Sequence, residues 1–198
     1  MPLSQPADRK LIHTRRIECH GFERGDGLWD IEGRITDTKS YSFENQDRGL
    51  VASGVPVHDM HVRMTLTPEL EVVEAEAATE ASPFNVCPAI TGRIAELKGL
   101  KVARGWTEAV RKVLGGKLGC THITHLLIGP MAATAYQTIV PYKNRNVEKS
   151  APKVRPDVLD TCHALASDGE VVRDRWPQFY SGDGTAGELI SDTDAVSS

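Results

Sequence analysis

Three side chains that commonly bind transition metals lie close together in the sequence, at Cys120, His122 and His125. If Thr121 caps a helix at this point, the two histidines lie three positions apart on one face of its first turn. A thiolate with two imidazoles suits zinc or iron, although this spacing is not an established zinc signature. Two other interpretations remain open. The histidines either act as a general acid or base beside helix N-terminal amides, or pack as ordinary structural residues.

A second ionisable group follows from the alternation of residues 28–37, where polar and apolar side chains point to opposite faces of a strand. Asp30, Glu32 and Arg34 share the polar face, and a glycine-containing turn brings His20 of the preceding strand beside them. Burying unpaired charges is costly, so this group is a neutralised network or an active site if helices cover the face. If the face is open to water, these residues are ordinary surface charges. The sequence leaves both alternatives open.

A third group surrounds His58 and Asp59, at the start of a strand that directly follows a loop containing glycine and proline. His58 falls on the apolar side of this strand with Met60 and Val62, whereas Asp59 falls on the other side. A histidine on an apolar face is often a hydrogen-bonded core residue. Because functional side chains are commonly presented where a loop meets a strand, a catalytic or ligand role for His58 is the alternative.

The spacing of the cysteines and the absence of several known motifs reduce the number of reaction classes that fit this sequence. The four cysteines lie far apart, so free thiols are expected rather than disulfides. No local motif supplies a base for a nucleophilic thiol. The sequence also lacks the common signatures of dinucleotide, nucleoside triphosphate, zinc-protease, thioredoxin and α/β-hydrolase sites. These observations favour acid–base chemistry on a small molecule.

The elements that must position these groups begin with strands and continue with helices. Alternation with period two predicts four antiparallel strands, at about residues 15–22, 28–37, 57–66 and 70–77, with a loop at 40–56. Ser82 and Pro83 begin the first predicted helix, and Thr107 caps a second at 108–114. Thr121 caps a long apolar helix that Pro130 interrupts. The predicted fold is α+β, with an antiparallel β-meander of about four strands followed by a small helical bundle packed on the sheet.

The chain of 198 residues is 40% hydrophobic and 25% charged, which is typical of a globular protein with its own core. We expect a single domain over residues 11–180 with a flexible N-terminus at 1–10. A basic linker or flap is expected at 141–156, a short helix at 157–165 and a disordered tail at 181–198.

The net charge of −4 argues against nucleic acid as the main partner. No apolar run is long enough to cross a membrane, and residues 1–10 lack the apolar core of a signal peptide. We therefore expect a cytoplasmic protein whose partner is a small-molecule substrate rather than a membrane. Self-association into a homo-oligomer is left open.

Five short motifs, taken together, resemble the bacterial family of unknown function DUF2889. They are Ile12-His13-Thr14-Arg15-Arg16, Asp30-Ile31-Glu32-Gly33-Arg34 with Asp37, His58-Asp59-Met60, Gly119-Cys120-Thr121-His122 and Cys162-His163-Ala164. The resemblance extends over about residues 11–180. It implies a lyase or accessory protein in the catabolism of aromatic compounds. One reaction that fits is cofactor-free retro-aldol release of formaldehyde from a lignin-derived phenol bearing a hydroxymethyl group.

The leading hypothesis is therefore an acid–base lyase that needs no cofactor. In the retro-aldol version, His58 or Asp59 removes the proton of the primary alcohol, and Arg34 or a helix N-terminus stabilises the phenolate. The residues expected to orient these groups are His20, Glu32 and Asp37. The residues expected to stack on the aromatic ring are Phe22, Trp29 and Tyr41.

Two alternatives belong to other functional classes. The first is a non-catalytic accessory protein that binds Zn or Fe through Cys120, His122 and His125, with His20 or Cys162 completing the ligand set. The second is an interaction module that uses the basic segment 143–155 to bind an acidic partner.

Overall fold

The computed structural model describes residues 3–146, 154–156 and 158–182. The chain divides into two compact units, Met1–Val147 and Glu148–Ser198. The single domain expected over residues 11–180 stays a prediction, as does the flexibility of residues 1–10. Residues 147–153 of the expected linker and residues 183–198 of the expected tail lie outside the described residues.

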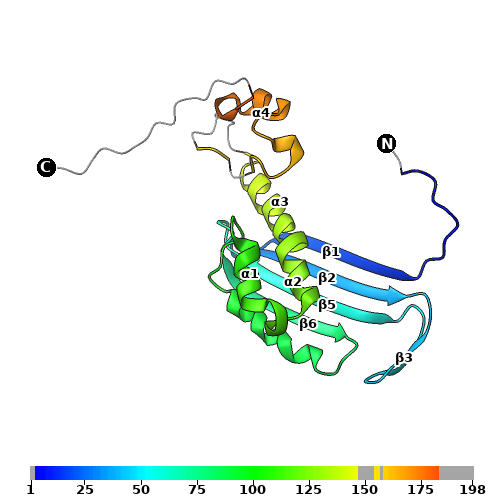
Figure 1. The fold of residues 1–198 in the computed structure, drawn as a ribbon. Helices are drawn as coiled ribbons and strands as arrows, with labels where there is room; N and C mark the ends of the chain where they lie inside the picture. Colours follow the sequence, from blue (N-terminus) through cyan, green and yellow to red (C-terminus); the bar gives the residue numbers. More distant parts are fainter. Residues whose placement is uncertain (1–2, 147–153, 157, 183–198) are drawn as a thin grey trace. The chain divides into compact units, whose positions relative to one another are not determined.

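The first unit is built on an antiparallel sheet with the strand order β1-β2-β5-β6 (Figure 1). Its strands are β1 (His13–Glu23), β2 (Trp29–Lys39), β5 (Pro56–Leu66) and β6 (Val72–Ala81). The predicted four-stranded meander is therefore confirmed. The expected loop at 40–56 instead contains β3 (Phe43–Asn45) and β4 (Gly49–Val51), which pair as a small second sheet.

The two faces of the four-stranded sheet differ because side chains alternate along each strand. On β2, Trp29, Ile31 and Ile35 are buried in the core, whereas Arg34 on the opposite face is exposed. Full burial of one such apolar side chain contributes roughly 1.5–3 kcal/mol, so the apolar face is the one that the helices cover. We refer to the two sides of the sheet as the covered face and the open face.

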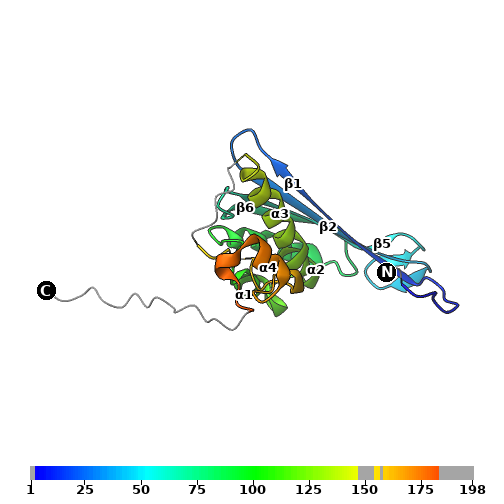
Figure 2. The same ribbon diagram turned by 90° about the horizontal axis from the view of Figure 1, so that it is seen from above.

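Helices follow the strands along the chain and pack on the covered face (Figure 2). They are the 3₁₀ helix η1 (Cys87–Leu97), α1 (Trp106–Leu114), the 3₁₀ turn η2 (Gly116–Leu118), α2 (Thr121–Leu126), the π turn η3 (Leu127–Met131) and α3 (Ala132–Lys143). The fold of this unit is α+β, as the sequence predicts.

The first two helices begin at other residues than the sequence signals suggest. The 3₁₀ helix η1 carries Pro88, rather than Pro83, in its first turn. Gly105, rather than Thr107, precedes α1, and its φ of 91° lies in the left-handed region that favours glycine. Backbone conformation at a glycine therefore decides this helix start, rather than a side-chain cap.

The segment from α2 to α3 is one helical path with a widened turn in its middle. Cys120 is the N-cap of α2, and Thr121 is the first helical residue rather than the cap. The predicted interruption at Pro130 is confirmed, because this residue lies inside the π turn η3. Pro141, expected to begin the linker, instead lies within α3.

Close contact between helices and sheet depends on small residues at their interface. A Cβ atom on Gly33 of β2 would lie 2.7 Å from Met131 Sδ, so the glycine leaves room for the side chain of Met131 between the π turn and the sheet. Trp106 fills the space beside this turn and donates its indole N–H to the carbonyl of Leu127 at 2.8 Å. These contacts help to hold the start of α2 over the end of β2 and the start of β5.

The second unit contains η4 (His163–Leu165), α4 (Glu170–Arg175) and η5 (Pro177–Phe179). Within the described part of the helix expected at 157–165, residues 158–165, the structure has a 3₁₀ turn at His163–Leu165. Asp160 accepts a hydrogen bond from the backbone N–H of Ser167 at 2.7 Å, which closes the loop between them. Across the described parts of both units, no helix has the length and apolar character required to span a membrane.

Candidate functional site

Asp37 and His58 lie side by side on the covered face, where their Cα atoms are partners in the pairing of β2 with β5. Asp37 has the same strand parity as Ile35, so its carboxylate points toward the helices and is only 1% exposed. His122, the second residue of α2, reaches the same carboxylate from above the sheet. Residues far apart in the sequence therefore meet where two strands face the start of a helix.

The carboxylate of Asp37 is the centre of this group. Arg15 of β1 donates two hydrogen bonds to it, from Nε at 2.8 Å and from an Nη at 2.7 Å. His13 Nε2 lies 3.0 Å from one carboxylate oxygen, and His58 Nδ1 lies 3.1 Å from the other. His122 Nε2 is 3.6 Å from that second oxygen. These five residues form what we call the Asp37 cluster.

The ionisation of Asp37 is fixed by its neighbours. Burial alone raises the pKa of a carboxyl group, but the hydrogen bonds and charge of Arg15, with smaller contributions from His13 and His58, lower the pKa of Asp37 to about 2. The group is therefore an anion throughout the physiological pH range.

The two inner histidines are held in the uncharged form. Burial lowers the pKa of His58, and Asp37 opposes this effect only in part. Burial and the charges of His58 and Arg15 lower the pKa of His122 to about 4. The imidazole rings of His58 and His122 lie against each other with centroids 3.9 Å apart, a contact that uncharged rings tolerate and two imidazolium ions do not.

Cys120 contacts the far edge of the His122 ring. Its Sγ lies 3.7 Å from Nδ1, while Nε2 of the same ring faces Asp37. His125 is exposed on the next turn. Among the described residues, the side chains whose ligand atoms all lie within 4.8 Å of one another are Asp37, His58 and His122. The structure thus retains His122 from the set predicted by spacing, but groups it with residues of the sheet.

The profile of the family described as "Protein of unknown function (DUF2889)" matches residues 13–137. The chain belongs to the DUF2889 family. The matched region begins at His13 and contains the complete Asp37 cluster, whereas Cys162 and His163 lie beyond its end. No curated protein and no solved structure matches the chain.

The open face of the DUF2889 sheet carries the other predicted charged residues. Arg34 donates two hydrogen bonds to Asp59, at 2.9 and 2.7 Å, and His61 Nε2 lies 3.4 Å from the same carboxylate. His20 pairs with Glu18 on β1. Arg34 and Asp59 are therefore separated from Asp37 and His58 by the sheet itself.

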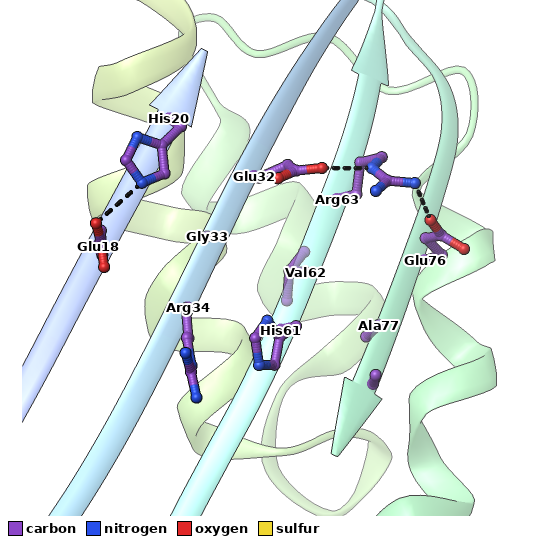
Figure 3. A pocket seen from close by; sticks show the side chains of 11 residues that line it. Glu18, His20, Glu32, Gly33, Arg34, His61, Val62, Arg63, Glu76 and Ala77 are labelled. Carbon is purple, nitrogen blue, oxygen red and sulfur yellow. Dashed lines mark hydrogen bonds and ion pairs between the residues drawn. The ribbon is translucent and has the colours of Figure 1, made fainter. Parts of the chain in front are cut away.

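A second ionic group on the open face lines a hollow (Figure 3). Arg63 bridges Glu32 and Glu76, through contacts of 2.8 and 2.7 Å. All three side chains are more than a third exposed, so each pair contributes little to stability. Together with Arg34, Asp59 and His61 they form what we call the open-face network.

The three aromatic residues predicted to stack on a ligand lie in different places. Trp29 is buried in the core and packs edge-on against Tyr142, with ring centroids 5.3 Å apart. Phe22 is 46% exposed beside His20. Tyr41 is exposed beside Phe43. The structure does not bring these rings together.

Sequence reasoning missed the roles of His13 and Arg15, although a signal for them exists. Both have odd positions in β1, as Ile17 and Cys19 do, and the register pairs Arg15 with Asp37. The strand alternation would have assigned them to the same face as Asp37 once the hairpin register was known. The turn between β1 and β2, closed at Gly27 with a φ of 84°, fixes this register.

Proposed function

We propose that this DUF2889 protein is an acid–base enzyme in which His58 is the general base. The observation that carries the proposal is the 3.1 Å contact between His58 Nδ1 and Asp37 Oδ2. An ionised carboxylate only accepts hydrogen bonds, so this contact assigns the proton of the neutral ring to Nδ1 and leaves a lone pair on Nε2. A histidine oriented in this way accepts a proton from a bound substrate.

The rest of the cluster supports proton transfer. Asp37 remains ionised, so it stabilises the imidazolium that forms on His58. Arg15 is 42% exposed at the rim of the cluster and offers positive charge to an anion that develops on the substrate. In this scheme Asp37 orients the base and Arg15 stabilises the anion. The sequence predicts the first role for His20, Glu32 and Asp37 together and the second for Arg34 or a helix N-terminus.

The proposed reaction class is carbon–carbon cleavage or elimination on a small aromatic molecule. In the retro-aldol version, His58 Nε2 removes the proton of a primary alcohol and the adjacent carbon–carbon bond breaks. Formaldehyde leaves, and the electron pair of the broken bond stays on the substrate carbon as a carbanion that the adjacent ring delocalises. The imidazolium of His58 then returns its proton to the substrate carbon, so no oxidant or cofactor is consumed. The aromatic substrate class is carried over from the expectation attached to the family resemblance, since the matching family model names no activity.

The test is release of formaldehyde from phenols that carry a hydroxymethyl group on the side chain, measured with the full chain in the presence of a chelator. We expect His58→Gln to lower kcat/KM about 10²–10⁴-fold, the usual contribution of a positioned general base. The matched control is His61→Gln, because His61 is on the same strand but belongs to the open-face network.

We expect the control variant to retain the activity of the wild-type protein. Full activity in His58→Gln would show that His58 is not the base. An equal loss in both variants would also contradict the proposal, because it would remove the distinction between the two faces of the sheet.

A further inference from the structure

We propose that Asp37, His58 and His122 bind one divalent transition-metal ion, and that this ion displaces Arg15 from Asp37. The part of this inference that concerns enzyme regulation rests on the function proposed above. The binding site itself rests on the geometry of the three side chains.

The spacing of the three side chains matches one coordination sphere. Zinc bonds of about 2.0–2.2 Å place neighbouring ligand atoms of a tetrahedral ion about 3.3–3.6 Å apart. Asp37 Oδ2 lies 3.1 Å from His58 Nδ1 and 3.6 Å from His122 Nε2. One ligand atom from each residue lies within 4.8 Å of the other two. Small side-chain adjustments therefore suffice to bring all three onto one ion.

The chemistry of the donors indicates which ions fit. Two imidazoles and one carboxylate suit Zn²⁺, Fe²⁺, Co²⁺ or Ni²⁺ better than Ca²⁺ or Mg²⁺, which prefer oxygen ligands. Three protein ligands leave a further position for water. Asp37 is buried on the covered face and the rings of His58 and His122 are only 21% and 17% exposed, so strands and helix fix the ligands on three sides.

Cys120 has a supporting place in this site rather than a ligand position. Its Sγ contacts Nδ1 of His122, on the edge of the ring away from Asp37. A partner at that nitrogen orients the ring so that Nε2 faces the metal, as groups behind metal-binding histidines commonly do.

Arg15 is the group that must move. Its guanidinium already makes two hydrogen bonds to Asp37, and a second cation at the same carboxylate is repelled by it. Because Arg15 is 42% exposed on a long flexible side chain, it can turn into solvent. Arginine and metal ion therefore compete for one carboxylate.

Metal binding would also change the proton on His58. Coordination through Nδ1 moves the ring proton to Nε2, and this nitrogen then donates instead of accepting. The general base proposed above would be lost, so the ion would inhibit the enzyme reversibly.

The experiment is a titration of the chelator-treated full chain with Co²⁺, followed by the visible absorption of the bound ion and by calorimetry. We expect one equivalent to bind, and Arg15→Gln to bind Co²⁺ about tenfold or more tightly because a repelling charge is gone. Arg34→Gln is the matched control, since this arginine makes the equivalent pair of bonds with Asp59, and we expect unchanged affinity. His122→Gln and His58→Gln should each lose the Co²⁺ absorption, and circular dichroism checks that each variant is folded.

Absence of Co²⁺ binding to both wild type and Arg15→Gln would overturn the metal site and leave the acid–base function standing. The metal site would also be overturned if His58→Gln and His122→Gln both still bind Co²⁺. The same conclusion would follow if Arg15→Gln binds Co²⁺ no more tightly than the wild-type protein. If Co²⁺ binds at this site and formaldehyde release requires it, the metal site is confirmed, whereas the cofactor-free function and the inhibitory role of the ion both fail. Measuring Co²⁺ binding and formaldehyde release on the same variants therefore distinguishes a failure of the metal site from a failure of the proposed function.

Discussion

Asp37 and Asp59 are two carboxylates on opposite faces of one sheet, and each is held by an arginine through two hydrogen bonds of nearly equal length. Their other partners differ. Asp59 has one further histidine, His61, which is 43% exposed. Asp37 gathers three histidines from β1, β5 and α2. An arginine–carboxylate pair alone therefore does not mark the candidate site.

The difference arises from what each face meets. Asp59 itself is only 8% exposed, but its partners among the described residues all come from the sheet, and the side chains of Arg34 and His61 are 49% and 43% exposed, so water screens their charges. On the covered face a helix adds His122 and removes solvent, so the same kind of carboxylate acquires uncharged imidazoles at short distance. Covering one face by helices therefore places two uncharged imidazoles beside an arginine–carboxylate pair, and this arrangement distinguishes the Asp37 cluster from the pair of Arg34 with Asp59.

The largest expected effect is on catalysis. Asp37→Asn removes the charge that orients and stabilises His58, and we expect formaldehyde release to fall about 10³–10⁴-fold, as in other histidine–carboxylate pairs. Asp59→Asn makes the same chemical change on the open face and should retain most activity. Equal losses in steady-state kcat for the two variants would mean that the two carboxylates are not functionally distinct.

A large stability difference is expected between neighbouring residues of β2. Ile35 is fully buried on the covered face, and Ile35→Ala should lower the free energy of unfolding by about 2–5 kcal/mol. Thr36→Ala, one residue further and on the other face, should change it by less than about 1 kcal/mol. Urea unfolding of both variants measures the difference, and similar midpoints would contradict the assignment of the faces.

Stability should also depend on pH through the buried histidines. The folded state lowers the pKa of His122 from 6.5 to about 4, so the unfolded chain binds more protons between these values. The contribution of His122 to the free energy of unfolding is therefore fully present above pH 6.5. It falls as the pH decreases toward 4, by on the order of 2–3 kcal/mol. Unfolding of the metal-free protein across this range should show the decrease, and His122→Gln should flatten it. An identical profile in the variant would rule out His122 as its source.

The smallest effect is expected in the open-face network. Arg63→Gln breaks exposed ion pairs with Glu32 and Glu76, and we expect a loss of less than about 1 kcal/mol that disappears at high salt. A larger loss in thermal unfolding, unaffected by salt, would show that this face is not open in solution.

Strand alternation was sufficient to predict the faces, and this explains how much of the site followed from sequence. It assigned His58 to the apolar side, with Met60 and Val62, and the structure confirms that side as the covered one. It also indicates that Asp30, Glu32 and Arg34 share the other face, and the structure resolves the alternative left open in the sequence, because the helices cover the apolar face instead.

Strand alternation could not predict that the residues of the Asp37 cluster lie in contact with one another. The approach of His122 to Asp37 depends on how α2 packs on the sheet, which no local pattern of residues specifies. The pairing of Arg15 with Asp37 depends on the hairpin register. The density of charged residues instead favours Arg34 and Asp59, because a sequence shows an arginine and a carboxylate equally well on either face of the sheet.

The π turn η3 has a consequence for the direction in which His122 points. A π turn contains one residue more than an α-helical turn, so it rotates the preceding helix by about 100° relative to the following one. Removing one residue at Gly129 or Pro130 would leave α3 anchored through Ala135 and Ile139 while turning His122 away from the sheet. The direction in which the His122 side chain points is therefore set by the extra residue of the π turn, which rotates α2 about its axis and lies several residues after His122.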